Sequence, residues 1–313
     1  MGAEILSPFT FLSVLWLKMV LKVKQKGNVE DRIFSSLGVL PVPDHYYQPL
    51  VNPKKHLKKS LRADRNLPGI NLNVQEQLEI LSKFNFNDEL LEFPINQRNK
   101  IAGAEFYYDN GLYCSGDAEY LFNMLRFFKP KKMIEIGSGQ STLMALNAIA
   151  KNTQDDKNYH CEHICIEPYE GAWLESKNLT VIRKKVEDID VSFFEQLEAN
   201  DVLFIDSSHI IRPQGDVLFE YLEILPILKP GVIVHIHDIF TPKDYLDHWI
   251  YQQHLLWNEQ YLLEAFLSLN DHFKIIGATN YLSHNYRNEF AAKCPVFAQQ
   301  TDREPGAFWI QRV

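Results

Sequence analysis

Four polar residues that follow apolar runs have the types and spacing for acid–base or metal chemistry. Asp206 ends one such run and His209 follows three residues later, while His237 and Asp238 end another. Two carboxylates with nearby imidazoles suit a hard divalent cation such as Mg²⁺, and we expect Asp206, His237 and Asp238 to be its ligands. Such a cation lowers the pKa of a bound hydroxyl. His209 is suited to remove that proton, because the pKa of a histidine lies near neutrality, so Asp206 and His209 are the predicted catalytic residues.

The turn Gly137-Ser138-Gly139 is a candidate ligand-binding loop, because an apolar run precedes it and a helix-compatible run follows it. Glycine lets the backbone turn tightly and approach a ligand closely, and a helix N-terminus attracts carboxylate or phosphate groups. Glu135 lies just before the turn, and Glu167 ends the next apolar run. An acid at the tip of the second strand suits the two hydroxyls of a ribose. We therefore expect all five residues to contact a cofactor that contains a ribose.

The same loop argues against a nicotinamide dinucleotide as that cofactor. The dinucleotide fingerprint places a third glycine three residues after the second, and this chain has Thr142 there. An oxidoreductase that uses such a cofactor is therefore disfavoured.

Strands and helices alternate from residue 118 onwards, which predicts a doubly wound, mostly parallel α/β sheet. In such sheets the ligand binds at the carboxyl ends of the strands, so the glycine turn and the four polar residues should share one edge. The expected strands are 133–136, 163–167, 179–183, 202–206, 232–237, 273–277 and 307–313, and the expected helices are 118–128, 141–150, 192–199 and 217–228.

These motifs resemble those of the class I S-adenosylmethionine-dependent methyltransferases. The resemblance covers roughly residues 100–313 and is carried by Glu135–Thr142, Glu167, Asp201–His209 and Leu228–Asp238. It implies a Rossmann-like, seven-stranded sheet whose last two strands form an antiparallel edge. It also implies S-adenosylmethionine as the cofactor and a small molecule as the acceptor substrate.

The spacing Asp206-x-x-His209 resembles the base-bearing motif of metal-assisted sugar O-methyltransferases, which implies methyl transfer to a hydroxyl. The family often places an acid near the adenine at the position of Glu187-Asp188, and we expect Asp188 to bind the cofactor. In one respect the chain departs from that branch. Those enzymes present two acids after the fifth strand, whereas this chain has His237-Asp238, which bears on whether a metal binds there and on which one. The alternative is a catalytically idle protein of the same fold that binds the cofactor or docks on a partner.

Charge is distributed unevenly along the 313 residues. The formal net charge of −8 argues against nucleic-acid binding by bulk electrostatics. Residues 1–65 nevertheless carry 11 Lys and Arg against five Asp and Glu, which suggests a surface contact for this basic segment. The four cysteines lack the spacing of a common zinc site and indicate free thiols in a reducing compartment. We therefore expect a cytoplasmic protein.

Residues 5–21 form an apolar run that is followed by a basic segment. A secretory signal would carry its positive charge before the apolar region, and a spanning helix would not be interrupted by Pro8 and Lys18. An amphipathic helix fits better. Two contacts remain open for residues 5–26: a membrane surface, or protein, whether its own domain or a second subunit of a homo-oligomer.

Proline, asparagine and lysine are frequent in residues 38–73, which predicts an extended connector. We therefore expect two parts. Residues 1–72 would form an amphipathic helix with an extended basic connector, and residues 73–313 would form the methyltransferase domain, with its core at 118–313.

Overall fold

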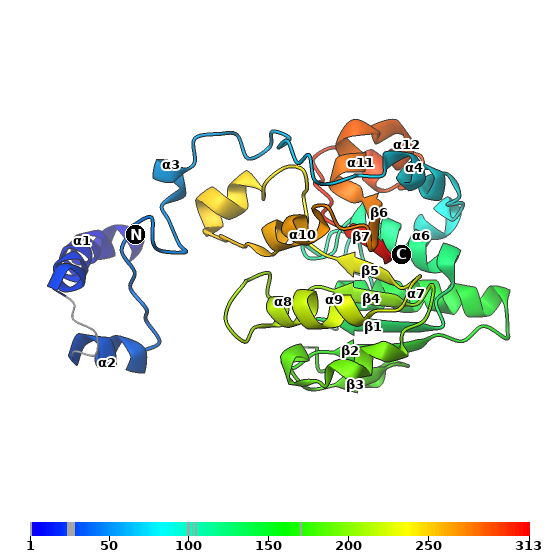
Figure 1. Ribbon diagram of the computed structural model, residues 1–313, viewed down its shortest axis with the longest axis horizontal. Coiled ribbons are helices and arrows are strands. Elements are labelled where there is room, and N and C mark those ends of the chain that lie inside the picture. The colour runs from blue at the N-terminus through cyan, green and yellow to red at the C-terminus, as the bar shows by residue number, and fades with distance from the viewer. Residues whose placement is uncertain (1, 24–28, 99–100, 102, 104, 170) are drawn as a thin grey trace. The chain divides into compact units, whose positions relative to one another are not determined.

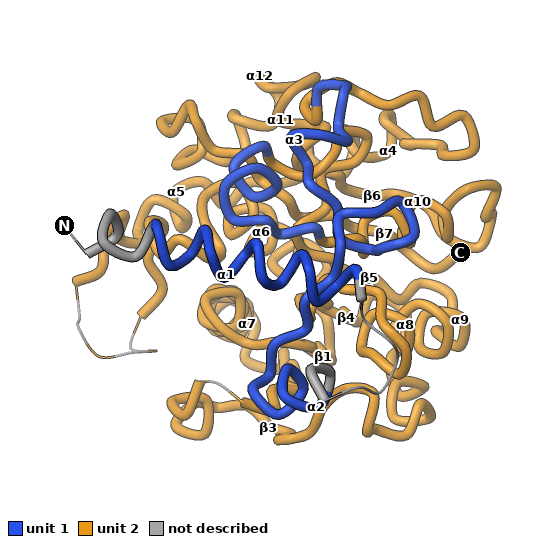
Figure 2. Tube along the Cα trace, turned by 90° about the vertical axis from the view of Figure 1, so that its left-hand side faces the viewer, with its two compact units in different colours: residues 1–60, 247–256 blue, residues 61–246, 257–313 orange. Residues whose placement is uncertain are grey.

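The computed structural model describes the chain except for residues 1, 24–28, 99–100, 102, 104 and 170. Two compact units, coloured in Figure 2, consist of residues 1–60 with 247–256 and of residues 61–246 with 257–313. The chain thus divides earlier than the expected boundary at residue 72, and a later segment joins the first unit. The assignment of independent domains stays a prediction.

In the described residues of the first unit there are three α-helices, of which α1 (Gly2–Val23) occupies the residues where the sequence predicts one. The others are α2 (Val29–Ser36) and α3 (Pro53–His56), and a π-helical turn covers Trp249–Gln253. Trp16 of α1 packs edge-on against Phe34 of α2, with ring centroids 6.1 Å apart. Residues 24–26 of the expected contact segment lie outside the described residues. Within the described part of the chain, no helix combines the length and hydropathy that crossing a bilayer requires.

A seven-stranded sheet forms the centre of the second unit, in the order β3-β2-β1-β4-β5-β7-β6 (Figure 1). The strands β1 to β5 pair in parallel, and β7 runs antiparallel to both β5 and β6. This confirms the Rossmann-like, mostly parallel sheet with an antiparallel C-terminal edge. The strands are β1 (Lys132–Ile136), β2 (Glu162–Ile166), β3 (Thr180–Ile182), β4 (Val202–Ile205), β5 (Ile233–Ile236), β6 (Phe273–Ala278) and β7 (Phe308–Arg312).

Helices cover both faces of this sheet (Figure 1). One face carries α4 (Val74–Ser82), α5 (Asn87–Leu90), α6 (Asp117–Phe128), α7 (Gln140–Asp155), α11 (Thr279–Asn285) and α12 (Arg287–Ala291). The other carries α8 (Asp216–Phe219), α9 (Leu225–Ile227) and α10 (Glu259–Leu267). A π-helical turn, Glu220–Ile224, joins α8 to α9. The three segments together form one continuous helical stretch at the position of the helix expected at 217–228. The helix expected at 192–199 is instead a 3₁₀ segment, Val191–Gln196.

Alternation along each strand decides which core a side chain enters. Ile134 and Ile136 of β1 enter the apolar core beneath α8 to α10, and Met133 enters the core beneath α6 and α7. Glu135 shares the Met133 face, so its carboxylate lies inside the protein on the α7 side. Parallel strands are buried on both faces, which is why β4 is a fully buried run of four apolar residues.

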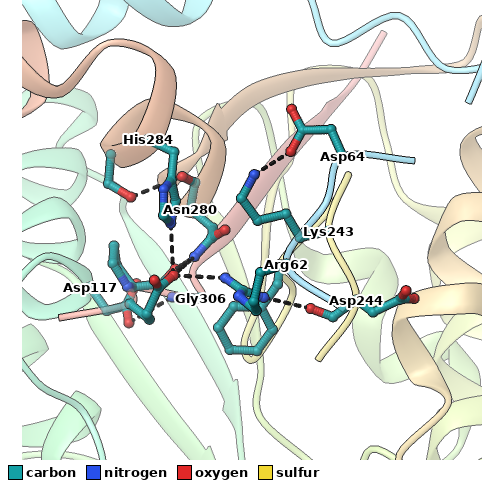
Figure 3. Close-up of polar contacts among 12 residues, drawn as sticks. Arg62, Asp64, Asp117, Lys243, Asp244, Asn280, His284 and Gly306 are labelled. Carbon is teal, nitrogen blue, oxygen red and sulfur yellow. Dashed lines mark hydrogen bonds and ion pairs between the residues drawn. The ribbon is translucent and has the colours of Figure 1, made fainter. Parts of the chain in front are cut away.

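The loop that follows β5 is held by the polar network in Figure 3. Arg62 donates to Glu304 Oε2 at 2.8 Å and to the carbonyl of Asp244 at 2.7 Å. Glu304 also accepts a hydrogen bond from Asn280, and His284 Nε2 lies 2.9 Å from the same carboxylate. One partly buried carboxylate therefore joins the start of the second unit to α11.

The segment that leads into β7 is fixed from two sides. Asp117 at the start of α6 accepts the backbone N–H groups of Gly306 at 3.0 Å and Ala307 at 2.7 Å. The carbonyl of Gly306 accepts the N–H of Ile239 at 2.8 Å. The backbone just after Asp238 is thus anchored to α6, which places that acid on a rigid support.

Replacing Glu304 by Gln should destabilise the protein in a pH-dependent way. Burial alone would raise the pKa of Glu304, but hydrogen bonds from His284 and Asn280 and the charge of Arg62 lower the pKa to about 2. The stabilisation is therefore fully present above the unfolded pKa near 4.5 and is lost as the pH falls towards 2. We expect Glu304→Gln to lower the free energy of unfolding by about 1–2 kcal/mol at pH 7, as measured by urea denaturation.

The control is Glu223→Gln, at an exposed position on the second unit, which should change stability little at any pH. A Glu304→Gln deficit that is as large at pH 3 as at pH 7 would show that the carboxylate charge is not the source of the effect.

Candidate active site

The carboxyl ends of β1, β2 and β4 open onto a pocket of about 580 Å³. Backbone hydrogen bonds continue across this edge, since Gly137 N donates to the Ile166 carbonyl at 3.0 Å and Asp206 N donates to the Ile136 carbonyl at 2.9 Å. A larger pocket, of about 740 Å³, lies along α7 and contains none of the strand-end acids. The described residues that line the strand-end pocket include Gly137, Glu167, Tyr169, Glu187, Asp206 and Ser208.

The glycine turn brings the end of β1 against the end of β4. Gly137 has a φ of +76°, and a Cβ on it would lie 2.0 Å from the carbonyl oxygen of Asp206, so no other residue fits without displacing that strand end. Gly139 differs, because a Cβ there would meet no protein atom within 4 Å. Gly137 is therefore required for the packing of the two strand ends, whereas Gly139 leaves open space beside the loop.

Glu167 is held at the rim of the turn. Its carboxylate accepts the N–H of Ser138 at 3.3 Å and the N–H of Tyr169 at 2.8 Å. These bonds fix the side chain at the pocket wall. The geometry fits the expected role of binding two ribose hydroxyls.

Two other acids with predicted cofactor roles do not line this pocket. Glu135 is fully buried beneath the turn, where it accepts from Ser141 Oγ at 2.7 Å and lies 2.9 Å from His163 Nε2. It thereby holds the first turn of α7. Asp188 is exposed on a 3₁₀ turn, and its neighbour Glu187 lines the pocket instead. Contact of Glu135 or Asp188 with the cofactor stays a prediction.

A buried histidine and two carboxylates form the chemical centre of this edge. His209 Nε2 lies 3.3 Å from Asp206 Oδ1 and 3.6 Å from Asp238 Oδ2. The other ring nitrogen, Nδ1, lies 2.8 Å from Glu259 Oε2. His209 and Asp238 both adopt left-handed backbone conformations, with φ of +59° and +57°, which are uncommon for residues with side chains and cluster at functional sites.

The sequence did not point to Glu259, which begins α10 and is distant along the chain. The carbonyl of His209 accepts the N–H groups of Asn258 and Glu259, at 3.1 and 3.2 Å. Tyr221 Oη donates to Glu259 at 3.1 Å, and the Trp257 ring covers the imidazole with centroids 4.5 Å apart. Only the folded chain places Glu259 against His209. The one signal for Glu259 in the sequence is an acid at the position where a helix begins.

His237 and His235 face the same side of β5 but have different surroundings. His235 is fully buried, with its ring 4.0 Å from that of Phe204 and 4.6 Å from that of Trp309, so it belongs to the core. His237 Nε2 lies 3.5 Å from Asp238 Oδ1. His237 is therefore the histidine near the site, where it lies next to Asp238, one of the two acids that face His209.

Opposite charges balance in this buried cluster. Burial alone would lower the pKa of His209, but hydrogen bonds to Asp206 and Glu259 raise it well above the usual value. Burial would raise the pKa of Asp206, but the charges of His237 and His209 lower it to about 2. Burial raises the pKa of Asp238 above its ordinary range. The neighbouring carboxylates thus favour the protonated form of His209, whereas burial favours the neutral form of Asp238.

The donor set fits a divalent cation as well as a proton. One oxygen each of Asp206 and Asp238 and a nitrogen of His209 lie within 4.8 Å of one another. The Glu259 carboxylate on Nδ1 would orient Nε2 towards the acids, as outer carboxylates do for metal-bound histidines. The structure therefore groups His209, rather than the expected His237, with the two acids, and binding of Mg²⁺ stays a prediction.

A model of the methyltransferase domain family matches residues 134–239. An uncharacterized protein of Archaeoglobus fulgidus is 32% identical over 203 residues, which cover 60% of this chain and 88% of that protein. Among solved structures, the plantazolicin methyltransferase BpumL in complex with SAH is 12% identical, covers 77% of this chain and 96% of its own, and has a TM-score of 0.39. A putative methyltransferase of Thermobifida fusca is 14% identical, with 62% and 80% coverage and a TM-score of 0.36.

The two loop glycines should respond differently to the same substitution. We expect Gly137→Ala to lower the free energy of unfolding by about 2 kcal/mol or more, because the new Cβ strikes the Asp206 carbonyl at a left-handed position. Gly139→Ala should fold with nearly wild-type stability, because its Cβ meets no protein atom. It should bind S-adenosylhomocysteine more weakly, because the Cβ occupies open space beside the loop that we expect to contact the cofactor. Thermal unfolding and calorimetric titration measure the two effects. Equal losses of stability in both variants would contradict this division of roles.

Proposed function

We propose that this chain, whose residues 134–239 match a methyltransferase domain model, uses S-adenosylmethionine to methylate a hydroxyl group of a small-molecule acceptor, such as a phenol or a sugar. The supporting observation is the buried His209, whose Nε2 lies 3.3 Å from Asp206, itself part of the pocket wall. A hydroxyl is a weak nucleophile until it loses its proton, so a base beside the methyl donor is the group that this reaction needs.

The cofactor residues act mainly by alignment. S-adenosylmethionine supplies a methyl group on a positively charged sulfur, and the sulfur departs with the bonding electron pair. Glu167 would accept the ribose hydroxyls, and the turn at Gly137 would let the backbone approach the ligand. Holding acceptor and methyl group in line removes much of the entropic barrier to a two-reactant step.

His209 would take the acceptor proton at Nε2. Glu259 accepts the hydrogen on Nδ1, which leaves Nε2 as the basic nitrogen and offsets the positive charge that forms on the ring. Trp257 covers one face of the imidazole and limits the access of water. Asp206 and Asp238 would orient the acceptor hydroxyl or a cation that carries it.

Mg²⁺ is the cation that we propose for this position, with Asp206, Asp238 and His209 as the protein groups that would hold it. Its contribution would be to polarise the acceptor hydroxyl and lower its pKa. A cation and a protonated imidazole repel each other. Metal loading would therefore favour the neutral, basic form of His209.

The His209→Ala variant should lose methyl transfer and keep cofactor binding. We expect turnover to fall by about 10²–10⁴-fold, with the dissociation constant for S-adenosylmethionine changed little, because His209 is not part of the pocket wall. The matched control is His160→Ala, at an exposed position. Turnover is measured with S-adenosylmethionine labelled with ¹³C at the methyl group and a panel of phenols, sugars, amines and thiols.

The chemical shift of the labelled carbon identifies the methylated atom. Label in O-methyl groups, lost in His209→Ala, supports the proposal. Label that appears only on nitrogen or sulfur, or turnover that survives the substitution, would overturn it.

Manganese binding tests the cation site without an acceptor. Mn²⁺ serves as a paramagnetic stand-in for Mg²⁺, and free Mn²⁺ is counted by electron paramagnetic resonance. We expect Asp206→Asn and Asp238→Asn each to weaken binding by at least about 10-fold, while Asp271→Asn, at an exposed position, leaves it unchanged. Equal Mn²⁺ affinity in all three variants would place the bound cation elsewhere.

A further inference from the structure

Exposed apolar side chains are concentrated in the first unit. On α1, the large apolar residues that remain exposed are Phe9, Phe11, Leu12, Val14, Leu15, Trp16 and Met19. Eight further exposed large apolar residues of the described chain, between Ile33 and Leu50, also belong to this unit. Contiguous apolar surface of this kind marks a site of interaction rather than ordinary surface composition.

The helical repeat gathers part of this surface into one stripe. Leu12, Leu15 and Met19 are three, four and seven residues apart, which places them on one face of α1. Phe9 and Leu12 are 68% and 63% exposed, and Met19 is 61% exposed. Trp16 lies within this stripe, between Phe9 and Leu12 around the helix, and makes an edge contact with Phe34 of α2. Within the described residues of the first unit, the stripe therefore stays accessible.

Positive charge lies next to the stripe. Lys18 and Lys22 are exposed and one turn apart on α1, and residues 1–65 carry 11 Lys and Arg against five Asp and Glu. A second basic group, Lys54–Lys59, follows in the same unit; there Lys55 already pairs with Asp44 at 3.1 Å. Lysine stems can lie along apolar surface while the ammonium groups reach an anionic layer.

We infer that α1 lies in the interface of a bilayer that contains anionic phospholipids, with the face of Phe9, Leu12, Leu15 and Met19 in the acyl region. A bilayer interface offers an apolar layer with phosphate groups directly above it, which matches an apolar stripe bordered by lysines. A second copy of α1 would offer the apolar stripe, but α1 carries Lys18 and Lys22 against a single acid, Glu4, so it provides no anionic layer for these lysines. This inference is independent of the chemistry at His209.

Vesicle binding tests the inference on the full chain. The probes are phosphatidylcholine vesicles with and without phosphatidylglycerol, and bound protein is measured by co-sedimentation. We expect binding to the anionic vesicles that weakens as salt is added. The double variant Leu12→Glu, Met19→Glu should bind at least about 10-fold more weakly. Lys18→Gln and Lys22→Gln should each cost about 5-fold in affinity.

The control is the double variant Leu222→Glu, Leu269→Glu, which makes the same charge change at two exposed leucines of the second unit. It should bind anionic vesicles more tightly than Leu12→Glu, Met19→Glu. Trp16 fluorescence should shift to the blue on anionic vesicles, and Trp16→Phe should remove that shift. Vesicle binding that is equal in both double variants would overturn the inference. So would a dimer in solution that Leu12→Glu, Met19→Glu dissociates without any effect on vesicle binding.

Discussion

The close approach of β1 to β4 is the constraint on which the site depends. The chain can pass from Ile136 into the loop only because Gly137 has no Cβ to strike the Asp206 carbonyl, 2.0 Å from where one would lie. The same contact sets the register at the carboxyl edge, since Asp206 N bonds to the Ile136 carbonyl and His237 N bonds to the Ile205 carbonyl. The cofactor loop, the first acid and the fifth strand are therefore parts of one hydrogen-bonded edge.

The buried charges at this edge are mutually dependent. An isolated carboxylate or imidazolium inside a protein is costly, and it becomes tolerable only with partners. His209 has Asp206 and Asp238 on one ring nitrogen and Glu259 on the other, so the imidazole and the carboxylates compensate one another. The same contacts hold the ring in one orientation, with Nε2 towards Asp206, which lines the pocket.

The two units differ in whether their apolar side chains are buried in a core or exposed. In the second unit, cores on both faces of the sheet and the Arg62–Glu304 network fix the loop behind Asp238. In the first unit, α1 leaves Leu12 and Met19 largely exposed, so its apolar surface is available for contact outside the chain. The predicted catalytic residues and the exposed apolar face of α1 thus belong to different units.

The sequence alone determined the parallel α/β sheet, the strand-end position of the glycine turn, and the neighbourhood of Asp206, His209 and Asp238, because these follow from alternation and from the rule that parallel strands end at one edge. It did not determine that β7 lies between β5 and β6, since no local pattern specifies the neighbour of a strand. Nor did it reveal Glu259, which is far along the chain from His209 and meets it at 2.8 Å. Tertiary packing alone decided which polar group faces which, because burial and long-range contacts depend on the whole fold and not on spacing along the chain.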